Sequence, residues 1–172
     1  MKTEYLLNRE VEQVLMLLTP SNRLALRVSL HTGLRISDVL SLETAKLSSR
    51  MWVVESKTGK KKLIGLPVEL LADLKSHAVG RWVFPSRTDP LRHRTRQAVW
   101  ADLKRASKAF RLKQNVAPHS FRKVYAVDLR EKYGDIEKVR RALNHDNQAT
   151  TLIYAMADIA LNAKHKKGRR KA

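Results

Sequence analysis

Pairs of charged side chains that include a possible phosphate-binding cation occur at two places in the first third of the sequence. Arg35 follows Gly33, which predicts a turn between two helices, and Asp38 lies about one helical turn further on. Lys57 and Lys60 stand on either side of the expected tip of a hairpin. The cations Arg35, Lys57 and Lys60 can each bind an anion. Taken alone, however, an exposed arginine–aspartate pair and a solvated lysine-rich hairpin are the simpler explanations.

Two further places combine histidine with arginine or tyrosine. His119 and Arg122 follow Pro118 at a spacing that puts both on one face of a helix start, where free backbone N–H groups also favour an anion. His145 precedes Tyr154 by nine residues. A phenol has a pKa of about 10 and is a weak nucleophile, so Tyr154 needs positive charge around the group that it attacks. Each residue alone also fits an ordinary surface, cap or core position.

The order of these residues is more informative than any one of them. Six side chains follow one another along the chain: Arg35, Lys57, His119, Arg122, His145 and Tyr154. Together with the segments around them, this order resembles the tyrosine recombinase family, also called the phage integrases. The matching segments span nearly the whole chain and read HTGLRISDVLSL, SKTGKKKLIGLP, PHSFRKVYAVDL and LNHDNQATTLIYA.

The resemblance implies that Tyr154 attacks the scissile DNA phosphate and forms a 3′-phosphotyrosyl link. Arg35 and Arg122 match the two arginines of the family, whose forked guanidinium groups grip the non-bridging phosphate oxygens. His145 matches the family's His-or-Trp position and adds a further hydrogen-bond donor. Phosphoryl transfer depends mainly on positioning and on fixed positive charge, which this set of side chains supplies.

The same resemblance makes His119 the general base for the tyrosine proton and Lys57 the acid for the departing 5′ oxygen. Asp38 falls at an acidic position of the family and is expected to steady Arg35. Asn144 stands where the family usually has glycine, and asparagine tolerates the left-handed backbone that glycine allows. The sequence has no cysteine, no clustered carboxylates and no glycine-rich phosphate loop. We therefore expect no metal, no ATP and no other cofactor.

These side chains must be positioned by a fold that is mainly α with a small antiparallel β-sheet, an α+β arrangement like the catalytic domain of the family. Hydrophobic spacing and turn residues predict helices over about 8–18, 20–30, 37–42, 67–77, 95–110, 119–133, 135–143 and 148–156. Asn8 is expected to cap the first of them. Strands over 51–54 and 63–66 are expected to form a hairpin around 57–60, and 82–85 a short third strand.

The domain organisation follows from the same resemblance. We expect residues 1–156 to form the catalytic domain, and 157–172 a C-terminal helix and basic tail that is exchanged with a neighbouring protomer. A disordered tail is the simpler alternative. Most relatives carry an N-terminal core-binding domain, which we expect to be absent from this chain. Both a piece of a longer enzyme and a natural single-domain member fit the sequence.

The charge of the chain indicates the kind of partner. Lys and Arg number 35 against 16 Asp and Glu, a formal net charge of +19. Such an excess implies a polyanion, and by charge alone RNA fits as well as DNA. The resemblance implies double-stranded DNA bound by a homotetramer, with a monomer as the alternative for the free chain. The expected DNA contacts are Lys60, Arg92, Arg94, Arg96, Lys104 and Lys123.

The expected function is site-specific recombination, in which DNA is cleaved and rejoined during integration or excision of a mobile element. No apolar run approaches the roughly 20 residues that a membrane span needs. We therefore expect no membrane partner and a cytoplasmic, DNA-associated protein encoded by a bacterium or a phage. Two alternatives stay open. One is a noncatalytic DNA-binding regulator on the same fold, and the other is a type IB topoisomerase-like activity.

Overall fold

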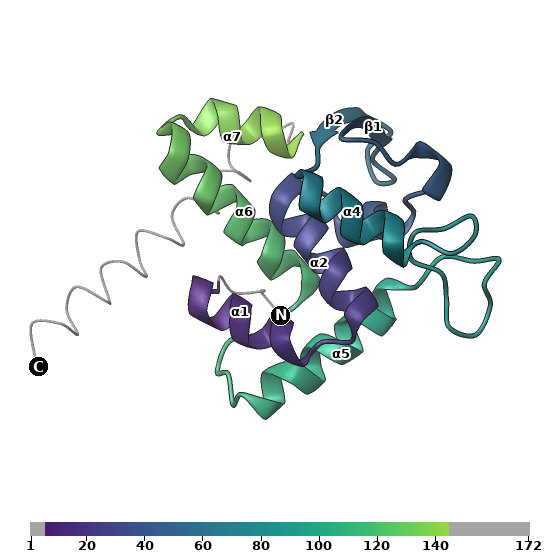
Figure 1. Cartoon of the computed structure of the whole chain (residues 1–172). Coiled ribbons are helices and arrows are strands. Elements are labelled where there is room, and N and C mark those ends of the chain that lie inside the picture. The colour runs from purple at the N-terminus through teal and green to yellow at the C-terminus, as the bar shows by residue number, and fades with distance from the viewer. Residues whose placement is uncertain (1–5, 145–172) are drawn as a thin grey trace, which may run out of the picture.

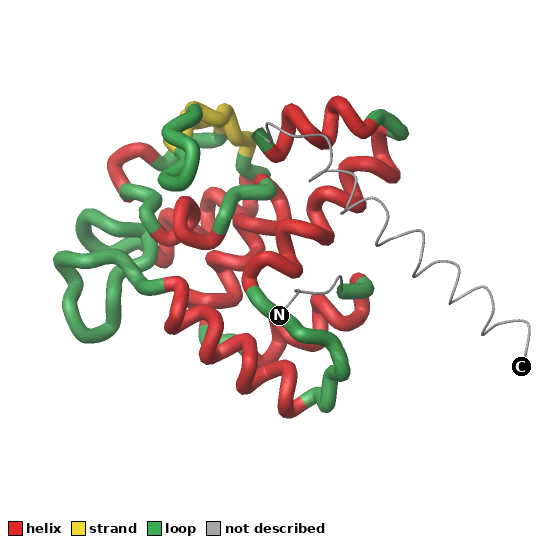
Figure 2. Tube along the Cα trace, turned by 180° about the vertical axis from the view of Figure 1, so that it is seen from behind, coloured by secondary structure: helices red, strands yellow, loops and turns green. Residues whose placement is uncertain are grey.

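The computed structural model describes residues 6–144, and within this range the chain is mainly helical with one small antiparallel sheet, as the sequence predicts (Figure 1). The elements in chain order are α1 (Asn8–Leu17), α2 (Pro20–Thr32), α3 (Ile36–Leu40), the 3-10 helix η1 (Thr44–Lys46), β1 (Arg50–Val54), β2 (Lys61–Gly65), α4 (Val68–His77), α5 (Arg96–Ala109), α6 (Pro118–Tyr133) and α7 (Ile136–Leu143). Figure 2 shows both strands at one edge of the molecule. None of these helices is long and apolar enough to cross a membrane.

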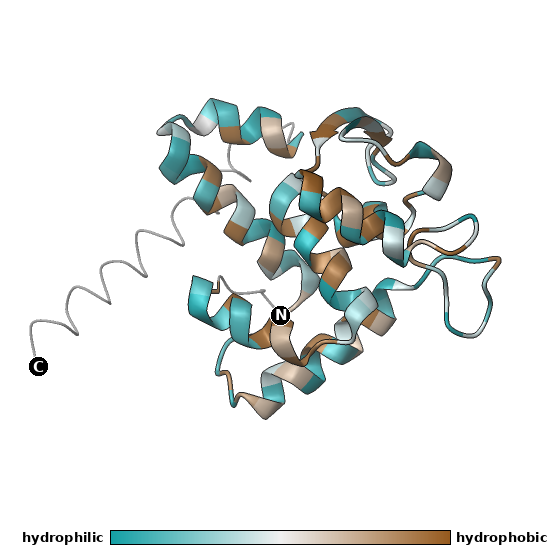
Figure 3. Cartoon of the chain, viewed as in Figure 1, coloured by the Kyte–Doolittle hydropathy of each residue, from teal (hydrophilic) through white to brown (hydrophobic). Residues whose placement is uncertain are grey.

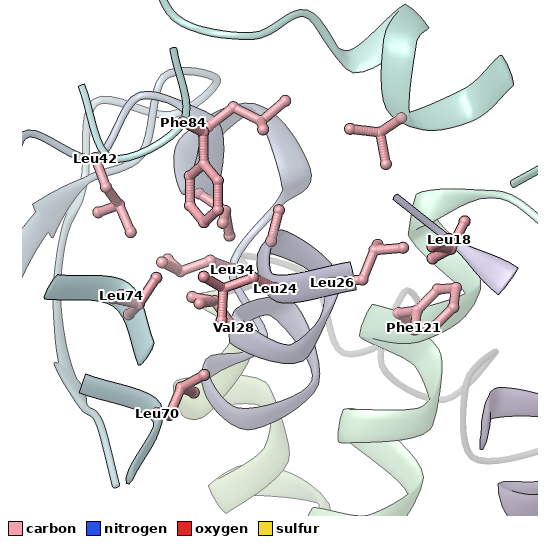
Figure 4. Close-up of a cluster of buried hydrophobic side chains, with 14 of the residues drawn as sticks. Leu18, Leu24, Leu26, Val28, Leu34, Leu42, Leu70, Leu74, Phe84 and Phe121 are labelled. Atoms are coloured by element: carbon pink, nitrogen blue, oxygen red, sulfur yellow. The ribbon is translucent and has the colours of Figure 1, made fainter. Parts of the chain in front are cut away.

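Helix α2 is the centre of the fold. It contacts α1, α3, α4 and α6, and its buried side chains include Leu24, Leu26 and Val28. Because burial is not confined to a single stripe, the other helices pack around α2 rather than beside it. Hydrophobic positions gather where α2 and α4 meet (Figure 3), and Leu70 and Leu74 of α4 belong to the same cluster as Val28 (Figure 4).

The hairpin brings two charged residues into the interior. Met51 pairs with Ile64 and Val53 with Lys62, and these four side chains point inward while the intervening residues are exposed. The alternation continues past the end of β1 to Glu55, which has no exposed surface. Lys62 and Glu55 therefore occupy positions that the strand period reserves for buried side chains.

The segment 82–85 does not form the expected strand. In the described part of the chain it makes only single bridges, from Trp82 to Glu43 and from Pro85 to His93. The two residues between them are both fully buried, which breaks the alternation of a half-buried strand. Pro85 also has no N–H with which to continue a ladder. The segment is instead an extended loop that contributes two buried side chains to the core.

Asn8 is the first residue of α1 and not its cap. Leu7 occupies the cap position, and its N–H donates to the carboxylate of Glu10 at 2.8 Å. The acidic side chain three residues on therefore satisfies the donor at this helix end, which makes a polar cap unnecessary. The helix expected over 148–156 lies outside the described residues.

Candidate active site

The turn that carries Arg35 is fixed from the interior. Gly33 ends α2 with a left-handed backbone, at a φ of 64°, which glycine adopts without steric cost. A Cβ at Gly33 would clash with the ring of Tyr125 from α6. The Ser29 hydroxyl donates to the carbonyl of Leu34 at 2.9 Å. These contacts hold Arg35 at the start of α3.

Lys62 attaches the hairpin to the same turn. Its ammonium group donates to the carbonyl of Thr32 at 2.6 Å and lies 5.6 Å from the centre of the Tyr125 ring, within the range of a cation–π contact. Burial lowers the pKa of Lys62 to about 8, and the nearby charge of Arg122 acts in the same direction. Strand β2 is thereby joined to the C-terminal end of α2, where a cation is favourable.

Arg122 comes from the first half of α6 and is 1% exposed. Its Nη2 donates to the carbonyl of Leu143 at 2.7 Å, at the end of α7. Asn144 ends this helix with a left-handed backbone, at a φ of 58°, so asparagine takes the conformation that we expected of it. The carbonyl-rich end of α7 therefore faces a buried guanidinium group, which is a favourable arrangement of charge and helix dipole.

The two arginines converge on Glu55. Arg35 Nη1 lies 2.9 Å from Glu55 Oε2, and Arg122 Nη1 lies 3.9 Å from Glu55 Oε1. The Thr58 hydroxyl also donates to Oε2, at 2.9 Å. Burial alone would raise the pKa of Glu55, but the hydrogen bonds from Arg35 and Thr58 lower it overall. An ionised carboxylate thus joins guanidinium groups from the α2–α3 turn and from α6.

His119 and Lys57 complete the described part of the site. His119 lies in the first turn of α6, and Lys57 lies exposed in the turn between β1 and β2. Although His119 is exposed, partial desolvation of its charged form and nearby cations lower its pKa to about 4. These cations are, in decreasing order of effect, Arg122, Lys123, Arg35 and Lys57. Because such effects decline with distance, these cations lie in the same region of the fold as the His119 ring.

Asp38 has a different partner from the expected one. Its Oδ1 accepts from the N–H of Ser56 at 2.9 Å and from the Ser56 hydroxyl at 2.6 Å. Within residues 6–144 the ion pair of Arg35 is with Glu55 and not with Asp38. The carboxylate of Asp38 therefore forms no ion pair with Arg35, although the Asp38 N–H donates to the Arg35 carbonyl at 2.9 Å. Asp38 instead fixes the start of the turn that carries Lys57.

Four of the six expected catalytic residues lie in the described range and in one region of the fold, where Arg35 and Arg122 meet at Glu55. The four are Arg35, Lys57, His119 and Arg122. His145 and Tyr154 lie outside the described residues. Two expected DNA contacts adjoin this group, Lys60 in the hairpin turn and Lys123 in α6. Over residues 6–144, His, Asp and Glu side chains form no group of three or more that could hold a metal ion.

The other expected DNA contacts belong to different segments of the chain. They are Arg92 and Arg94 in the loop before α5, and Arg96 and Lys104 in α5 itself. Helix α5 and the hairpin are at opposite ends of the molecule in Figure 1. Arg94 donates to Asn22 at 2.7 Å and Lys104 to Asn115 at 2.6 Å. These two side chains are therefore already engaged within the protein.

Sequence reasoning does not single out Glu55 or Lys62, although a signal for both exists. Each continues the inward-facing positions of a strand, which are 51 and 53 in β1, and 64 in β2. A charged residue at such a position is rarely buried without a partner of opposite charge or a hydrogen-bond acceptor. The strand period therefore indicates that Glu55 and Lys62 face other polar groups, but it does not say which.

The fold and the converging arginines define the catalytic-domain class of the tyrosine recombinases. The model of the phage integrase family matches residues 4–160, and the chain belongs to this family. Tyrosine recombinase XerD of Lacticaseibacillus casei is 30% identical over 139 residues, which cover 72% of this chain and 46% of XerD. The probable integrase/recombinase YoeC of Bacillus subtilis is 28% identical over 158 residues, which cover 87% of this chain and 85% of YoeC.

The solved structures support the same fold. The crystal structure of a lambda integrase dimer bound to a COC′ core site superimposes with a TM-score of 0.75 at 22% sequence identity. The match covers 90% of this chain and 48% of that protein. The chain thus spans just under half the length of XerD and of lambda integrase, and most of the length of YoeC.

Proposed function

We propose that this chain cleaves and rejoins DNA as the catalytic part of a site-specific recombinase, through a covalent bond between Tyr154 and a 3′ phosphate. The observation that carries the proposal is the convergence of Arg35 and Arg122 on one small anionic group, close to His119 and Lys57. A scissile phosphate is a ligand that suits such fixed cations, because catalysis of phosphoryl transfer depends on preorganised positive charge.

In the cleavage step, the Tyr154 oxygen forms a bond to phosphorus while the bond from phosphorus to the 5′ oxygen breaks. Arg35 and Arg122 bind the non-bridging oxygens and stabilise the charge that develops on them. His119 is uncharged at neutral pH because its pKa is lowered, so it can accept the phenol proton. Lys57 gives a proton to the departing 5′ oxygen.

In the rejoining step, a 5′-hydroxyl of the exchanged strand displaces Tyr154 from phosphorus. The phosphotyrosyl ester conserves the phosphodiester link, so this reversal consumes no nucleotide. Lys57 then accepts the proton of the attacking hydroxyl and His119 returns one to the phenol. His145 donates a further hydrogen bond to the same phosphate in both directions.

Double-stranded DNA is the proposed partner. The net charge of +19 supports a polyanionic ligand, and the lambda integrase dimer is bound to a core site. We propose that residues 1–156 are the catalytic domain, that the segment 157–172 is exchanged between protomers, and that four protomers act on two duplexes. Lys60 and Lys123 are the first DNA contacts to test, because they adjoin the site.

Covalent trapping tests the proposal. The chain is incubated with a pool of nicked duplexes of random sequence, in which the short fragment that carries the new 5′-hydroxyl diffuses away after cleavage. We expect an SDS-resistant protein–DNA adduct that is abolished by Tyr154→Phe. Tyr133→Phe is the matched control, because this tyrosine is 47% exposed at the end of α6, and it should leave the adduct unchanged.

Other outcomes identify the alternatives. An adduct that survives Tyr154→Phe would contradict the choice of nucleophile. Binding of duplex DNA without any adduct would favour the noncatalytic regulator. Relaxation of supercoiled plasmids regardless of their sequence would favour a type IB topoisomerase-like activity.

A further inference from the structure

Glu55 connects two parts of the site. Its side chain contacts both arginines, whereas its backbone closes the turn that carries Lys57. The Glu55 N–H donates to the carbonyl of Lys60 at 2.9 Å, and its carbonyl accepts from the N–H of Gly59 at 2.8 Å. The Thr58 hydroxyl, from the same turn, donates to the carboxylate. Any movement of this turn relative to the arginines must therefore strain the contacts of Glu55.

The carboxylate of Glu55 compensates several buried cations. Glu55 has no exposed surface, Arg122 is 1% exposed and Lys62 is 9% exposed. Cations at such depth repel one another, and a buried charge without a counter-charge is strongly unfavourable. The lowered pKa of Glu55 agrees with an ionised carboxylate. In the absence of DNA, Glu55 thus supplies the negative charge that holds the guanidinium groups near one point.

Glu55 leaves Arg35 available to a substrate. It contacts Arg35 through a single nitrogen, Nη1, whereas a guanidinium group carries five N–H donors. The Arg35 side chain keeps 22% of its surface exposed, while that of Glu55 keeps none. A phosphate that arrives from the solvent therefore meets Arg35 without displacing Glu55. The carboxylate lies behind the guanidinium group and supports it.

We propose that Glu55 is a positioning residue that holds Arg35 and Arg122 in a fixed relation to the Lys57 turn. This inference rests on the proposed DNA-cleaving function. Glu55 takes no part in making or breaking bonds. Loss of its charge lets the two guanidinium groups separate and lets the turn shift, which weakens the grip on the transition state. The defect is expected in the chemical step and not in DNA binding, to which many other cations contribute.

Two substitutions separate the effect of the charge of Glu55 from the effect of the length of its side chain. Glu55→Gln keeps the size of the side chain and removes its charge, whereas Glu55→Asp keeps the charge and shortens the side chain by one methylene group. With DNA recovered by covalent trapping, we expect Glu55→Gln to slow single-turnover adduct formation at saturating DNA by roughly 10- to 100-fold, as loss of a supporting partner does at other sites. DNA affinity should stay unchanged, and Glu55→Asp should recover part of the rate.

Glu43→Gln is the matched control. Glu43 forms ion pairs with Lys46 at 2.9 Å and with Arg81 at 3.6 Å, both on the surface. This substitution also removes a paired carboxylate from the neighbourhood of the hairpin, but it touches no residue of the site. We expect Glu43→Gln to cleave at the wild-type rate. A similar slowing in both Gln variants would overturn the specific role of Glu55.

A measurement without DNA makes the inference independent of cleavage. Hydrogen exchange of the Arg35 Nε–H, followed by NMR, reports how firmly the guanidinium group is held. We expect faster exchange in Glu55→Gln than in the wild type, in a protein that thermal unfolding shows to be folded. If Glu55→Gln does not fold, Glu55→Asp takes its place in both measurements, with a smaller change expected in each.

The outcomes separate the two proposals. A wild-type rate in a folded Glu55→Gln variant, or unchanged exchange at Arg35, would overturn the positioning role while leaving the proposed function intact. A wild-type chain that forms no adduct would count against the proposed function, and the NMR measurement would still decide what Glu55 does.

Discussion

Charged side chains at the site are held by neighbours from other segments of the chain. Arg35 is paired with Glu55, Arg122 donates to the Leu143 carbonyl, and Lys62 donates to the Thr32 carbonyl. His119 differs, because the charged neighbours with the largest effects on its pKa are cations. A site of this kind disfavours an imidazolium until an anion enters, and a bound phosphate then favours it.

We expect the titration of His119 to follow this pattern. In the DNA-free protein, NMR titration of the ring should give a midpoint well below the ordinary value of about 6.5, toward about 4. Because the folded-state pKa is lowered, the unfolded chain takes up the proton first as the pH falls. Folding stability therefore declines as the pH drops from about 6.5 toward about 4.

Addition of duplex DNA should raise the midpoint of His119. The DNA phosphate introduces negative charge near the ring and stabilises its protonated form. The titration of His119 in Arg122→Gln supplies the control, since removal of the largest cationic neighbour should also raise the midpoint. A midpoint at or above about 6.5 in the free wild-type protein would refute the lowered pKa of His119.

At the scale of elements, the α2–α3 turn decides where Arg35 lies. Gly33 is required there for two reasons, its left-handed backbone and the close approach of Tyr125. Gly134, which ends α6, has nearly the same backbone, at a φ of 65°, but nothing would lie within 4 Å of an added Cβ. The two glycines therefore separate the cost of the backbone conformation from the cost of the clash.

We expect Gly134→Ala to lower the free energy of unfolding by about 1–2 kcal/mol, the cost of a left-handed alanine. Gly33→Ala should cost roughly 1–3 kcal/mol more, because the ring of Tyr125 must move out of a packed interior. Urea denaturation of both variants measures the difference. Equal losses for the two substitutions would show that the contact between Gly33 and Tyr125 is not tight.

Some elements of the fold can be predicted from the sequence and others cannot. The helices and the two strands are predictable because each buries a face whose period is visible in the chain, as at Met51 and Val53. The segment 82–85 is not, because its bridges depend on Glu43 and His93, which belong to other parts of the fold. The partner of Asp38 is missed for the same reason, since Ser56 reaches it only when the hairpin packs against α3.

At the scale of the whole molecule, the site exists because α2 brings separate segments together. The α2–α3 turn, the hairpin and α6 each supply one part, and α6 packs directly on α2. The order of the six residues in the sequence indicates the family, but it contains no distances. Only the fold places the carboxylate of Glu55 between Arg35 and Arg122.

The claim that Arg35 and Arg122 bind one phosphate is tested most directly by removing charge from the protein and from the DNA, separately and together. Single-turnover adduct formation is measured for the wild type and for Arg35→Ala, on the normal duplex and on one with a methylphosphonate at the scissile position. On the normal phosphate we expect Arg35→Ala to be slower by roughly 10²–10³-fold, with DNA binding retained. On the methylphosphonate, where a neutral methyl group replaces one charged oxygen, the loss should shrink. A normal rate on the phosphate, or an equal loss on both substrates, would contradict the claim.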